Sequence, residues 1–466
     1  MKTQTKTPNM ETGSIPRLLA QLAVPAVVAQ IINLLYNIVD RIYIGHIPGI
    51  GAAALTGVGL FAPILMLLNA FAMLVGSGGA PRAAIAMGKK DNDLAEKILG
   101  NCFTLLVGLA VVLTVVFYVS APTLLRLFGA SDVTLTYASD YARIYILGSF
   151  FVLIVLGMNT FITTQGFARI SMMTTVIGAV INIILDPIFI FVLGMGVKGA
   201  AIATTIGNSV SLLFYLGYFL KSHTILSISP AQIGMRNGIA LGVLSIGIPT
   251  FCTNLLMSAS NLVLNRYLNQ IDVLATGGMG IAMKANMLVV FLQMGIGMGI
   301  QPLVGYHYGA RNFKKMSKIM RFSMVCTMGI GVTLTILYFI FTEPLVSIFM
   351  TADGAASAAD VAIQQGYAVK MLRALMLSGP FLGLIFVCNF SLQGMGRGLS
   401  SLLLSVCRQG FVFLPILVIA NATIGLNGII LAQPIADLIS VVLALILAEA
   451  AKRRAERMQQ SLQAKA

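Results

Sequence analysis

The sequence predicts an all-α integral membrane protein with twelve transmembrane helices, arranged as two parallel six-helix bundles related by pseudo-two-fold symmetry along the membrane normal. The prediction depends on the composition, on the placement of basic residues, and on a weak internal repeat. Of the 466 residues, 58% are hydrophobic and only 10% are charged. Soluble domains carry about 25% charged residues, so this chain has too few polar side chains to cover a water-exposed surface. Lipid is the solvent that suits such a composition.

The apolar segments are long and numerous enough for twelve membrane crossings, since a helix needs about 20 apolar residues to cross the hydrocarbon layer. We expect spans over residues 17–44, 52–78, 95–120, 138–165, 170–193, 199–220, 238–266, 276–305, 319–342, 365–393, 399–420 and 427–451. They define a cytoplasmic tail (1–16), an N-terminal bundle (17–220), a cytoplasmic connecting loop (221–237), a C-terminal bundle (238–451) and a basic cytoplasmic tail (452–466). Residues 1–16 lack the apolar core of a signal peptide, so we expect the first apolar segment to be retained as helix one.

Basic residues are distributed unequally between the two sides of these spans. The net charge is +15, and in a membrane protein Lys and Arg mark the cytoplasmic loops, so we expect no nucleic-acid partner. One side carries Lys2, Lys6, Arg17, Arg82, Lys89, Lys90, Lys97, Arg169, Lys221, Arg236, Arg311, Lys314, Lys315, Lys318, Arg321, Arg397, Lys452, Arg453, Arg454, Arg457 and Lys465. The opposite loops carry only Arg41, Arg126, Lys198 and Arg266. The asymmetry predicts an inner-membrane protein with both termini in the cytoplasm.

A weak internal repeat relates the two halves. Val24-Pro25 and Ile248-Pro249 each open a long span, and Asn37 and Asn261 follow at the same spacing. A second match pairs Gly76, Pro81, Gly88 and Lys90 with Gly297, Pro302, Gly309 and Arg311. A third pairs Gln165-Gly166 and Arg169 with Gln393-Gly394 and Arg397, and a fourth pairs Gly199–Asn208 with Gly428–Asp437. Because each half has an even number of helices, both halves start on the same side of the membrane and are parallel repeats.

Several classes of chemistry have no motif in this chain. The phosphate-loop pattern G-x-x-x-x-G-K-[ST] is absent, and so are H-E-x-x-H and G-x-S-x-G, so we expect neither ATP hydrolysis nor another enzyme activity. The five cysteines and three histidines are dispersed and show no ligand spacing, so we expect no metal cofactor or disulfide. Uphill transport by this chain would therefore need an ion gradient.

Two acidic residues at membrane depth are the candidates for ion coupling, because a charge there is costly and marks function by default. Asp40 lies late in helix one, and Asp186 lies inside helix five in Asn182-Ile-Ile-Leu-Asp186-Pro187. Asn182 and Asp186 are four residues apart and share a helix face. Pro187 removes a backbone donor and can free a carbonyl oxygen.

Helix six adds Thr204 and Thr205 next to small residues. Carboxylate, amide, hydroxyl and carbonyl oxygens are hard ligands that suit Na⁺. The same carboxyl groups could instead carry a proton, because burial and a second carboxylate both disfavour the charged form. The alternative is structural: Asp40 caps the outer end of helix one, and Asp186 pairs with an arginine.

The second half does not repeat this acidic pair. Leu264 occupies the place of Asp40, and Pro415 that of Asp186, so we expect the coupling chemistry in the N-terminal half. The other charged residues in or near C-terminal helices are expected to reach the interface or form structural ion pairs. They are Lys284, Lys370, Arg373, Arg408 and Asp437. Candidates for lining a central cavity are Tyr36, Tyr141, Asn159, Met172 and Met173.

These residues resemble the multidrug and toxic compound extrusion family. The likeness consists of the six-plus-six helices, Pro25, the Asn37/Asp40 pair, Asn182-x-x-x-Asp186-Pro187, Gly199-Ala200-Ala201 with Thr204, and the paired Gln-Gly-x-x-Arg blocks. It spans residues 15–450 and looks closest to the DinF-like branch, and within that branch to MepA-like bacterial multidrug pumps.

The resemblance implies cation/drug antiport by alternating access, with Na⁺ or H⁺ entering as the drug leaves. It implies a cation site formed by Asp40, Asn182, the Ala200 carbonyl, Asp186 and Thr204. It also implies a cavity around Tyr36, Asn37, Tyr141 and Asn159. Another branch of the family uses acidic residues in helices seven and ten, which this sequence lacks in its expected spans.

We therefore predict a secondary active multidrug efflux transporter of the bacterial inner membrane. It would export amphiphilic, mostly cationic compounds in exchange for H⁺ or Na⁺, and we expect a monomer. An alternative in the same superfamily is a flippase for a lipid-linked envelope precursor, for which Lys284, Arg373 and Arg408 would supply a cationic cavity.

Overall fold

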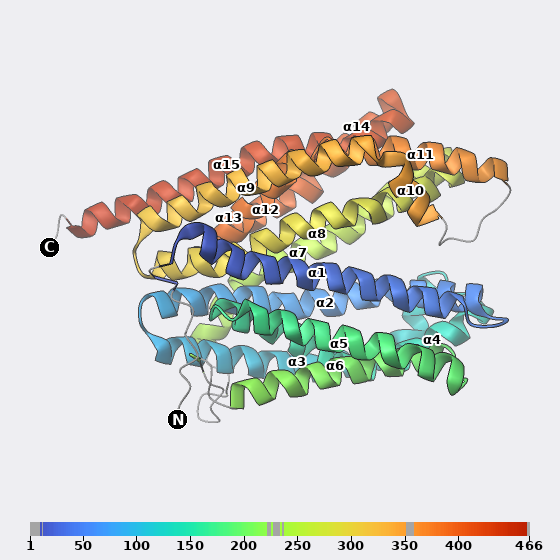
Figure 1. Cartoon of the computed structure of the whole chain (residues 1–466), viewed down its shortest axis with the longest axis horizontal. Coiled ribbons are helices and arrows are strands. Elements are labelled where there is room, and N and C mark those ends of the chain that lie inside the picture. The colour runs from blue at the N-terminus through green and yellow to red at the C-terminus, as the bar shows by residue number, and fades with distance from the viewer. Residues whose placement is uncertain are drawn as a thin grey trace. The chain divides into compact units, whose positions relative to one another are not determined.

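The computed structural model describes residues 10–11, 13–220, 225–226, 234, 237–350 and 358–463, and within these residues every regular element is a helix (Figure 1). The first half holds α1 (Ile15–Gly45), α2 (Gly51–Gly88), α3 (Asn92–Leu127), α4 (Asp132–Thr164), α5 (Ala168–Pro187), the π-helix η1 (Ile188–Val192) and α6 (Val197–Leu220). The second half holds α7 (Asn237–Ile271), α8 (Val273–Gly309), α9 (Phe313–Ile340), α10 (Thr342–Met350), α11 (Ala358–Met376), α12 (Gly379–Gly394), α13 (Gly398–Val406), the π-helix η2 (Cys407–Val412), α14 (Phe413–Ile424) and α15 (Leu426–Gln463).

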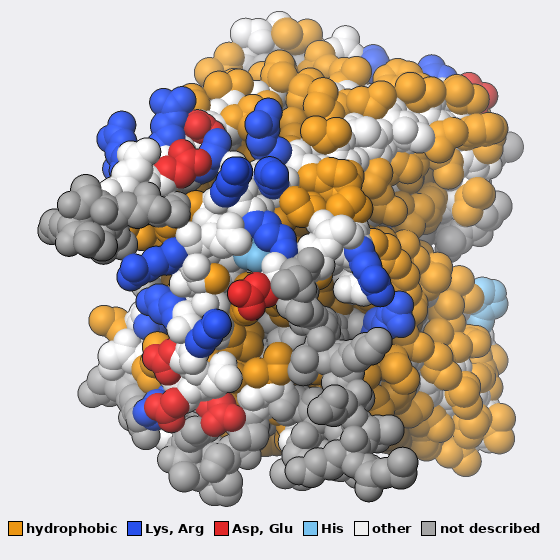
Figure 2. Space-filling model, turned by 60° about the vertical axis from the view of Figure 1, so that its left-hand side comes forward, with side chains coloured by type: hydrophobic (Ala, Val, Ile, Leu, Met, Phe, Trp, Pro, Cys, Tyr) orange, Lys and Arg blue, Asp and Glu red, His pale blue; other side chains and the backbone are white. Residues whose placement is uncertain are grey.

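The predicted membrane-spanning architecture is confirmed. Eleven helices among the described residues are long and apolar enough to cross a membrane, and a bent pair brings the number to twelve. Several helices extend well past the predicted spans: the span expected over 52–78 is part of α2 (Gly51–Gly88). Large apolar side chains such as Val119 and Leu399 are 75% and 81% exposed, as a lipid-facing surface requires. Figure 2 shows hydrophobic side chains over much of the visible surface, with Lys and Arg gathered toward one edge.

The bent pair is α11 and α12, whose axes differ by 52° where a single span was predicted over 365–393. The local cause is Ser378-Gly379-Pro380, because proline cannot continue a helix and restricts the residue before it. The Gln293 side chain donates a hydrogen bond of 2.9 Å to the Gly379 carbonyl, which satisfies a polar group at the break. Because α11 begins at Ala358, it also carries Asp360 in its first turn, an acid that the predicted span left out.

The chain divides into two compact units that differ from the predicted bundles. Among the described residues, unit 1 takes Val28–Phe251 with residues 10–11, and unit 2 takes Gly13–Val27 with the residues from Cys252 onward. The expected boundaries, 17–220 and 238–451, placed all of α1 in the first bundle and all of α7 in the second. Most of the expected connecting loop, 221–237, lies outside the described residues.

Close helix contacts through glycine explain why the start of α1 belongs to unit 2 and the start of α7 to unit 1. In unit 2, a Cβ at Gly299 would lie 2.6 Å from the Cα of Ala23, and one at Gly295 would lie 2.7 Å from Val27, so α8 packs directly on the start of α1. In unit 1, Gly247 at the start of α7 packs on the backbone of Leu74 in α2. Small residues permit such approaches between membrane helices. The boundaries between the units lie within α1 and α7, two residues after Pro25 and Pro249, which occupy equivalent positions of the repeat.

Each unit has its own apolar core, and the core of unit 1 lies beside the predicted ion site. Its largest fully buried side chains include Phe61, Ile64, Leu68 and Ile146 of α2 and α4. The same cluster contains Ala200 and Ala201 at the start of α6 and Ile190 in η1. The segment that follows Asp186 therefore packs against this core.

Candidate cation-binding site

Two carboxyl groups meet inside unit 1. Asp40 lies late in α1, five residues before the helix ends, and its residue is 8% exposed. Asp186 lies near the end of α5 and is fully buried. The two carboxyl groups lie close enough to interact directly. The structure thus brings together two residues that are 146 positions apart and that the sequence selected separately.

Neither carboxyl group has a basic partner among the described residues. Within the described part of the chain, no Lys, Arg or His nitrogen lies within 4 Å of Asp40 or Asp186. The nearby Arg41 side chain is exposed. The alternative in which Asp186 pairs with an arginine therefore has no support among these residues. Buried charges in membrane proteins are costly unless they are paired, protonated or bound to a cation.

An amide and a hydroxyl connect α5 to α6 at this pair. Asn182 uses its Nδ2 to donate to Asp186 Oδ1 at 3.3 Å and to Thr204 Oγ1 at 3.1 Å. Thr204 Oγ1 in turn donates to the Ala200 carbonyl at 3.0 Å. The Asn182 amide is thereby oriented with its oxygen free, while the Ala200 carbonyl and the Thr204 hydroxyl hold the arrangement in place.

Three buried oxygens at the site, Asp40 Oδ1, Asn182 Oδ1 and Asp186 Oδ2, lack a hydrogen-bond partner in the described part of the chain. Buried polar atoms are normally satisfied, so three in one place call for an explanation. Two carboxylate oxygens and one amide oxygen are hard ligands that suit a small monovalent cation, and either carboxyl group could instead hold a proton. The described residues contain no cluster of three or more His, Cys, Asp or Glu side chains of the kind that binds a transition metal.

The backbone after Asp186 fits the same picture. Pro187 ends α5 and cannot donate to the carbonyl four residues earlier, and the π-helix η1 follows at once. Such π-helices are frequent at functional sites. Gly194 and Gly196 then take positive φ angles of 64° and 56° and reverse the chain into α6. A Cβ at Gly199 would lie 2.7 Å from the Phe189 carbonyl carbon, so glycine is needed there.

Aromatic residues surround the carboxyl pair. Tyr36, Tyr141 and Tyr145 all lie within electrostatic reach of Asp40. The rings of Tyr141 and Tyr145 stack at 5.7 Å, and Phe61 meets both edge-on. Tyr36 and Tyr141 were predicted cavity residues, whereas Tyr145 was missed. Its position four residues after Tyr141 on the same helix face was the available signal.

Of the remaining predicted cavity residues, Asn159 and Met173 lie farther from the pair, whereas Asn37 lies one turn before Asp40 on α1. Asn159 of α4 donates to the Ser171 carbonyl at 3.2 Å and accepts from Thr174 at 3.0 Å. Thr174 precedes Asn182 by eight residues, or about 12 Å of helix. Met173 lies beside it on α5 and is 43% exposed. Asn37 is exposed and donates to the Asn33 carbonyl of its own helix.

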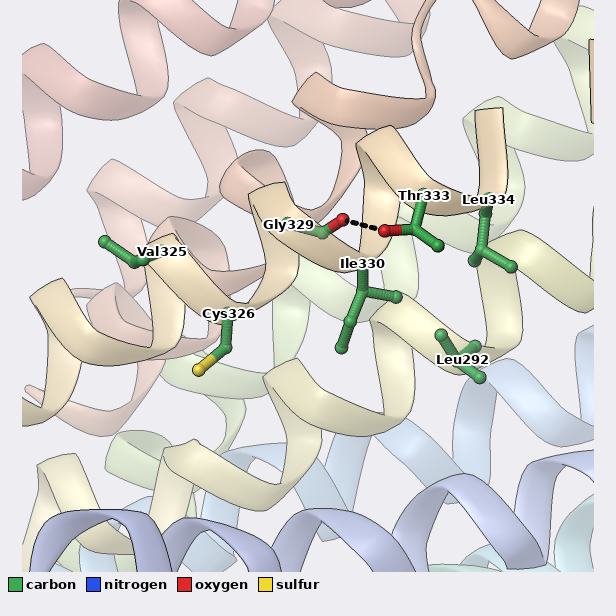
Figure 3. A pocket seen from close by; sticks show the side chains of 7 residues that line it. All are labelled: Leu292, Val325, Cys326, Gly329, Ile330, Thr333 and Leu334. Atoms are coloured by element: carbon green, nitrogen blue, oxygen red, sulfur yellow. Dashed lines mark hydrogen bonds between the residues drawn. The ribbon is translucent and has the colours of Figure 1, made fainter. Parts of the chain in front are cut away.

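The charged residues predicted in the C-terminal half are placed separately. Arg408 forms a buried ion pair with Asp437, as the structural interpretation expected. Lys370 donates to Asn427 at 2.6 Å, and Arg373 donates to Thr342 at 3.4 Å. Unit 2 also has a groove of about 530 Å³ between α8 and α9 (Figure 3). Its lining is almost wholly apolar and includes none of the predicted site residues: Leu292, Val325, Cys326, Gly329, Ile330, Thr333 and Leu334.

Thr204→Val is expected to weaken cation binding without unfolding the protein. Valine keeps the shape of threonine but removes the acceptor that fixes the Asn182 amide. Because one hydrogen bond is lost, we expect about 5- to 10-fold weaker cation binding. The measurement is the cation concentration that half-maximally stabilises the purified protein against heat. Thr205→Val is the control, since its hydroxyl donates to the Ala201 carbonyl and lies off the site. Equal effects of both substitutions would contradict the assignment.

The fold and the site define a polytopic membrane protein made of two helical units, one of which buries a pair of carboxyl groups among hard oxygen ligands. The MatE family model matches residues 25–188 and 249–419, and the chain belongs to this family. It is 27% identical over 442 residues to the multidrug export protein MepA of Staphylococcus saprophyticus, with 94% of each chain covered. It is 26% identical over 447 residues to MepA of Staphylococcus haemolyticus, with 95% of each covered.

Solved structures show the same fold. An outward-facing multidrug resistance MATE family transporter of the MOP superfamily aligns with a TM-score of 0.90 at 24% identity, covering 98% of this chain and 100% of that one. A MOP superfamily transporter from Pyrococcus furiosus aligns with the same TM-score, identity and coverage. The family and fold predicted from sequence are thus confirmed.

Proposed function

We propose that this chain is a secondary active exporter that exchanges H⁺ or Na⁺ for amphiphilic, mostly cationic organic compounds by alternating access. The observation that carries the proposal is the buried Asp40/Asp186 pair, which has free oxygens and no basic partner among the residues that the structure describes. Relatives that match 94–95% of the chain are multidrug export proteins by name. Their names support the cargo class, and the carboxyl pair supports the energy source.

The coupling follows from competition for one negative charge. A small cation that binds at Asp40 and Asp186 neutralises the pair and removes its attraction for a cationic cargo. A ligand shifts a conformational equilibrium only by its differential affinity for the two states. If the small cation favours one access state and the cargo the other, each drives the exit of the other, and the coupling is reciprocal.

Either H⁺ or Na⁺ could be bound by the oxygens of Asp40 and Asp186. As a proton carrier, the pair would share one proton between two carboxyl groups in contact. As a sodium site, it would use Asp40, Asn182 and Asp186 as ligands, with Thr204 completing the shell once its hydroxyl turns from the Ala200 carbonyl. Both carboxyl groups are buried, which strengthens either interaction.

The cargo class is supported by the residues around the pair. Aromatic faces attract organic cations, and Tyr36 and Tyr141 lie next to the buried negative charge. Methionine adapts to ligands of different shape, and Met173 offers an exposed side chain farther along α5, about two turns before Asn182. A lipophilic cation would bind here through charge and aromatic contact instead of a fixed set of hydrogen bonds.

The proposal includes the setting of the transporter. The excess of Lys and Arg on one set of loops supports a bacterial inner-membrane protein with both termini in the cytoplasm. Each unit has its own core, and we propose that the monomer is the transporting form. The flippase alternative needs several free cationic side chains in one cavity, but Arg408 is neutralised by Asp437, Arg373 is hydrogen-bonded to Thr342, and Lys284 also interacts with another residue. The antiporter is therefore the better-supported function.

Transport by the purified protein in proteoliposomes tests the proposal. We expect ethidium to accumulate when a proton or sodium gradient of the correct direction is imposed and to stop when a matching ionophore collapses it. Applying each gradient alone identifies the ion. Protein-free liposomes and a reversed gradient are the controls. No gradient-dependent movement of ethidium, or of any other lipophilic cation tested in parallel, would refute the exporter.

A further inference from the structure

Unit 2 carries a polar cluster on α15, the counterpart of the helix α6 that supplies Thr204 to the cation site. The match of Gly199 with Gly428 continues along the helix, so that Thr204 corresponds to Gln433, Asn208 to Asp437 and Ser211 to Ser440. The counterpart of α6 is thus α15. It carries the buried Asp437 one turn after Gln433, which is the residue that corresponds to Thr204. The proposed exchange of cation and cargo does not use Asp437.

The acid is neutralised by a single arginine. Arg408 Nε lies 2.7 Å from Asp437 Oδ1, and the two side chains are 15% and 2% exposed. Gln433 donates to the same carboxylate oxygen at 3.0 Å. The guanidinium carbon lies 5.7 Å from the centre of the Phe386 ring. Arg408 is carried by the π-helix η2, whose altered winding sets the direction of its side chain.

Two buried hydroxyl groups next to this pair have no hydrogen-bond partner within the described ranges. Ser440 lies one turn after Asp437, Ser405 lies one turn before Arg408, and neither Oγ forms a hydrogen bond. The helix that carries Arg408 and α15 run in opposite directions, because only Gly425 separates α14 from α15. Both serines therefore lie on the same side of the ion pair. In unit 1 the equivalent Ser211 is satisfied by the Thr174 carbonyl at 2.9 Å.

We propose that this cluster is a second monovalent-cation site, in which the guanidinium group of Arg408 takes the place of the ion. Asp437, Gln433, Ser405 and Ser440 supply the hard oxygen ligands, and Arg408 fills the site as a tethered cation that cannot leave. The inference rests on the proposed function and deepens it, because unit 1 then holds the exchangeable cation and unit 2 a permanent one. Removing Arg408 should open a sodium site.

The test measures stabilisation by Na⁺ in a background where the unit 1 site is silenced. Thermal unfolding of the full-length protein in detergent is followed at about pH 8, from zero to about 200 mM NaCl, with choline chloride keeping the ionic strength constant. In D186N we expect a change in Tm below about 1 °C. In D186N/R408Q we expect Na⁺ to raise Tm by about 3 °C or more, because a ligand that binds only the folded state stabilises it. The triple variant with D437N should not respond.

Each result decides one question. A folded D186N/R408Q protein with no sodium response, or an equal response in the triple variant, overturns the second site. If Na⁺ raises the Tm of D186N itself, the cation site proposed in unit 1 is wrong. The second site is then still decided by comparing the sodium response of D186N/R408Q with that of D186N.

A second measurement covers failure to fold, since removing Arg408 leaves a buried charge uncompensated. If D186N/R408Q does not fold in choline chloride, it is expressed and purified in about 200 mM NaCl. We expect Na⁺ to restore folded, monodisperse protein, because the bound cation replaces the charge that Arg408 supplied. No recovery of D186N/R408Q in NaCl, or the same gain from Na⁺ in the triple variant with D437N, overturns the proposal.

Discussion

Asp186→Asn is expected to abolish gradient-driven efflux, reducing it about 100-fold or more, which corresponds to the loss of a typical coupling free energy. Asparagine has nearly the shape of aspartate but carries no charge, so it neither takes up a proton nor balances a sodium ion. Asn182 can still donate to the new side chain. Asp40→Asn is expected to give the same loss, because the two carboxyl groups act as one site.

The stability of these variants should move in the opposite direction. Asp186 is fully buried with one oxygen unsatisfied, so its charge costs folding free energy when no cation is bound. The neutral variant should unfold at the same or a higher temperature than the wild type in the absence of sodium. The variant should therefore lose transport activity and keep its thermal stability, whereas a misfolded variant would lose both.

The measurement is ethidium transport in proteoliposomes containing equal amounts of monodisperse protein. Asp93→Asn is the matched control, because Asp93 is an exposed carboxylate in the same unit and pairs with Lys97 on the helix surface. It should transport at the wild-type rate. Full efflux by Asp186→Asn or Asp40→Asn at normal expression would disprove the role of the pair.

The architecture was predictable from sequence because the membrane imposes simple rules on it. Each crossing needs an apolar stretch of fixed length, and basic residues report the side of each loop. The break between α11 and α12 was also visible as Ser378-Gly379-Pro380, although the apolar pattern continues across it. The division of α1 and α7 between units was not visible, because it depends on which glycines meet which helices in space.

The site was predictable in part for similar reasons. A carboxylate at membrane depth stands out in an apolar chain, and helical spacing joins Asn182 to Asp186. Tyr145 did not stand out, because a tyrosine in an apolar helix is ordinary until its neighbours are known. The offset between halves is 228 residues at Gln165/Gln393 and 229 at Gly199/Gly428, and the extra residue falls in the stretch that contains η2.

Gly207→Leu is expected to disrupt the cation site by separating α5 from α6. A Cβ at Gly207 would lie 2.7 Å from the Gly178 carbonyl oxygen and 3.5 Å from the Asn182 Cβ, so the two helices touch one turn from the site. A leucine there must push them apart, and the 3.1 Å contact between Asn182 and Thr204 cannot survive. We expect at least about 10-fold slower transport and a loss of about 1–3 kcal/mol of stability.

The size series at this position distinguishes the local effect from general damage. Gly207→Ala should be intermediate, because even a methyl group meets the Gly178 carbonyl. Gly217→Leu on the same helix should be neutral, since a Cβ there meets nothing within 4 Å. Cation-dependent stabilisation should weaken in the order Gly217→Leu, Gly207→Ala, Gly207→Leu. Retention of the wild-type response by Gly207→Leu would mean that the helix contact does not position Asn182. The equivalent position in unit 2 is Ala436, so the repeat keeps a glycine at this position only in the unit that has the proposed exchangeable site.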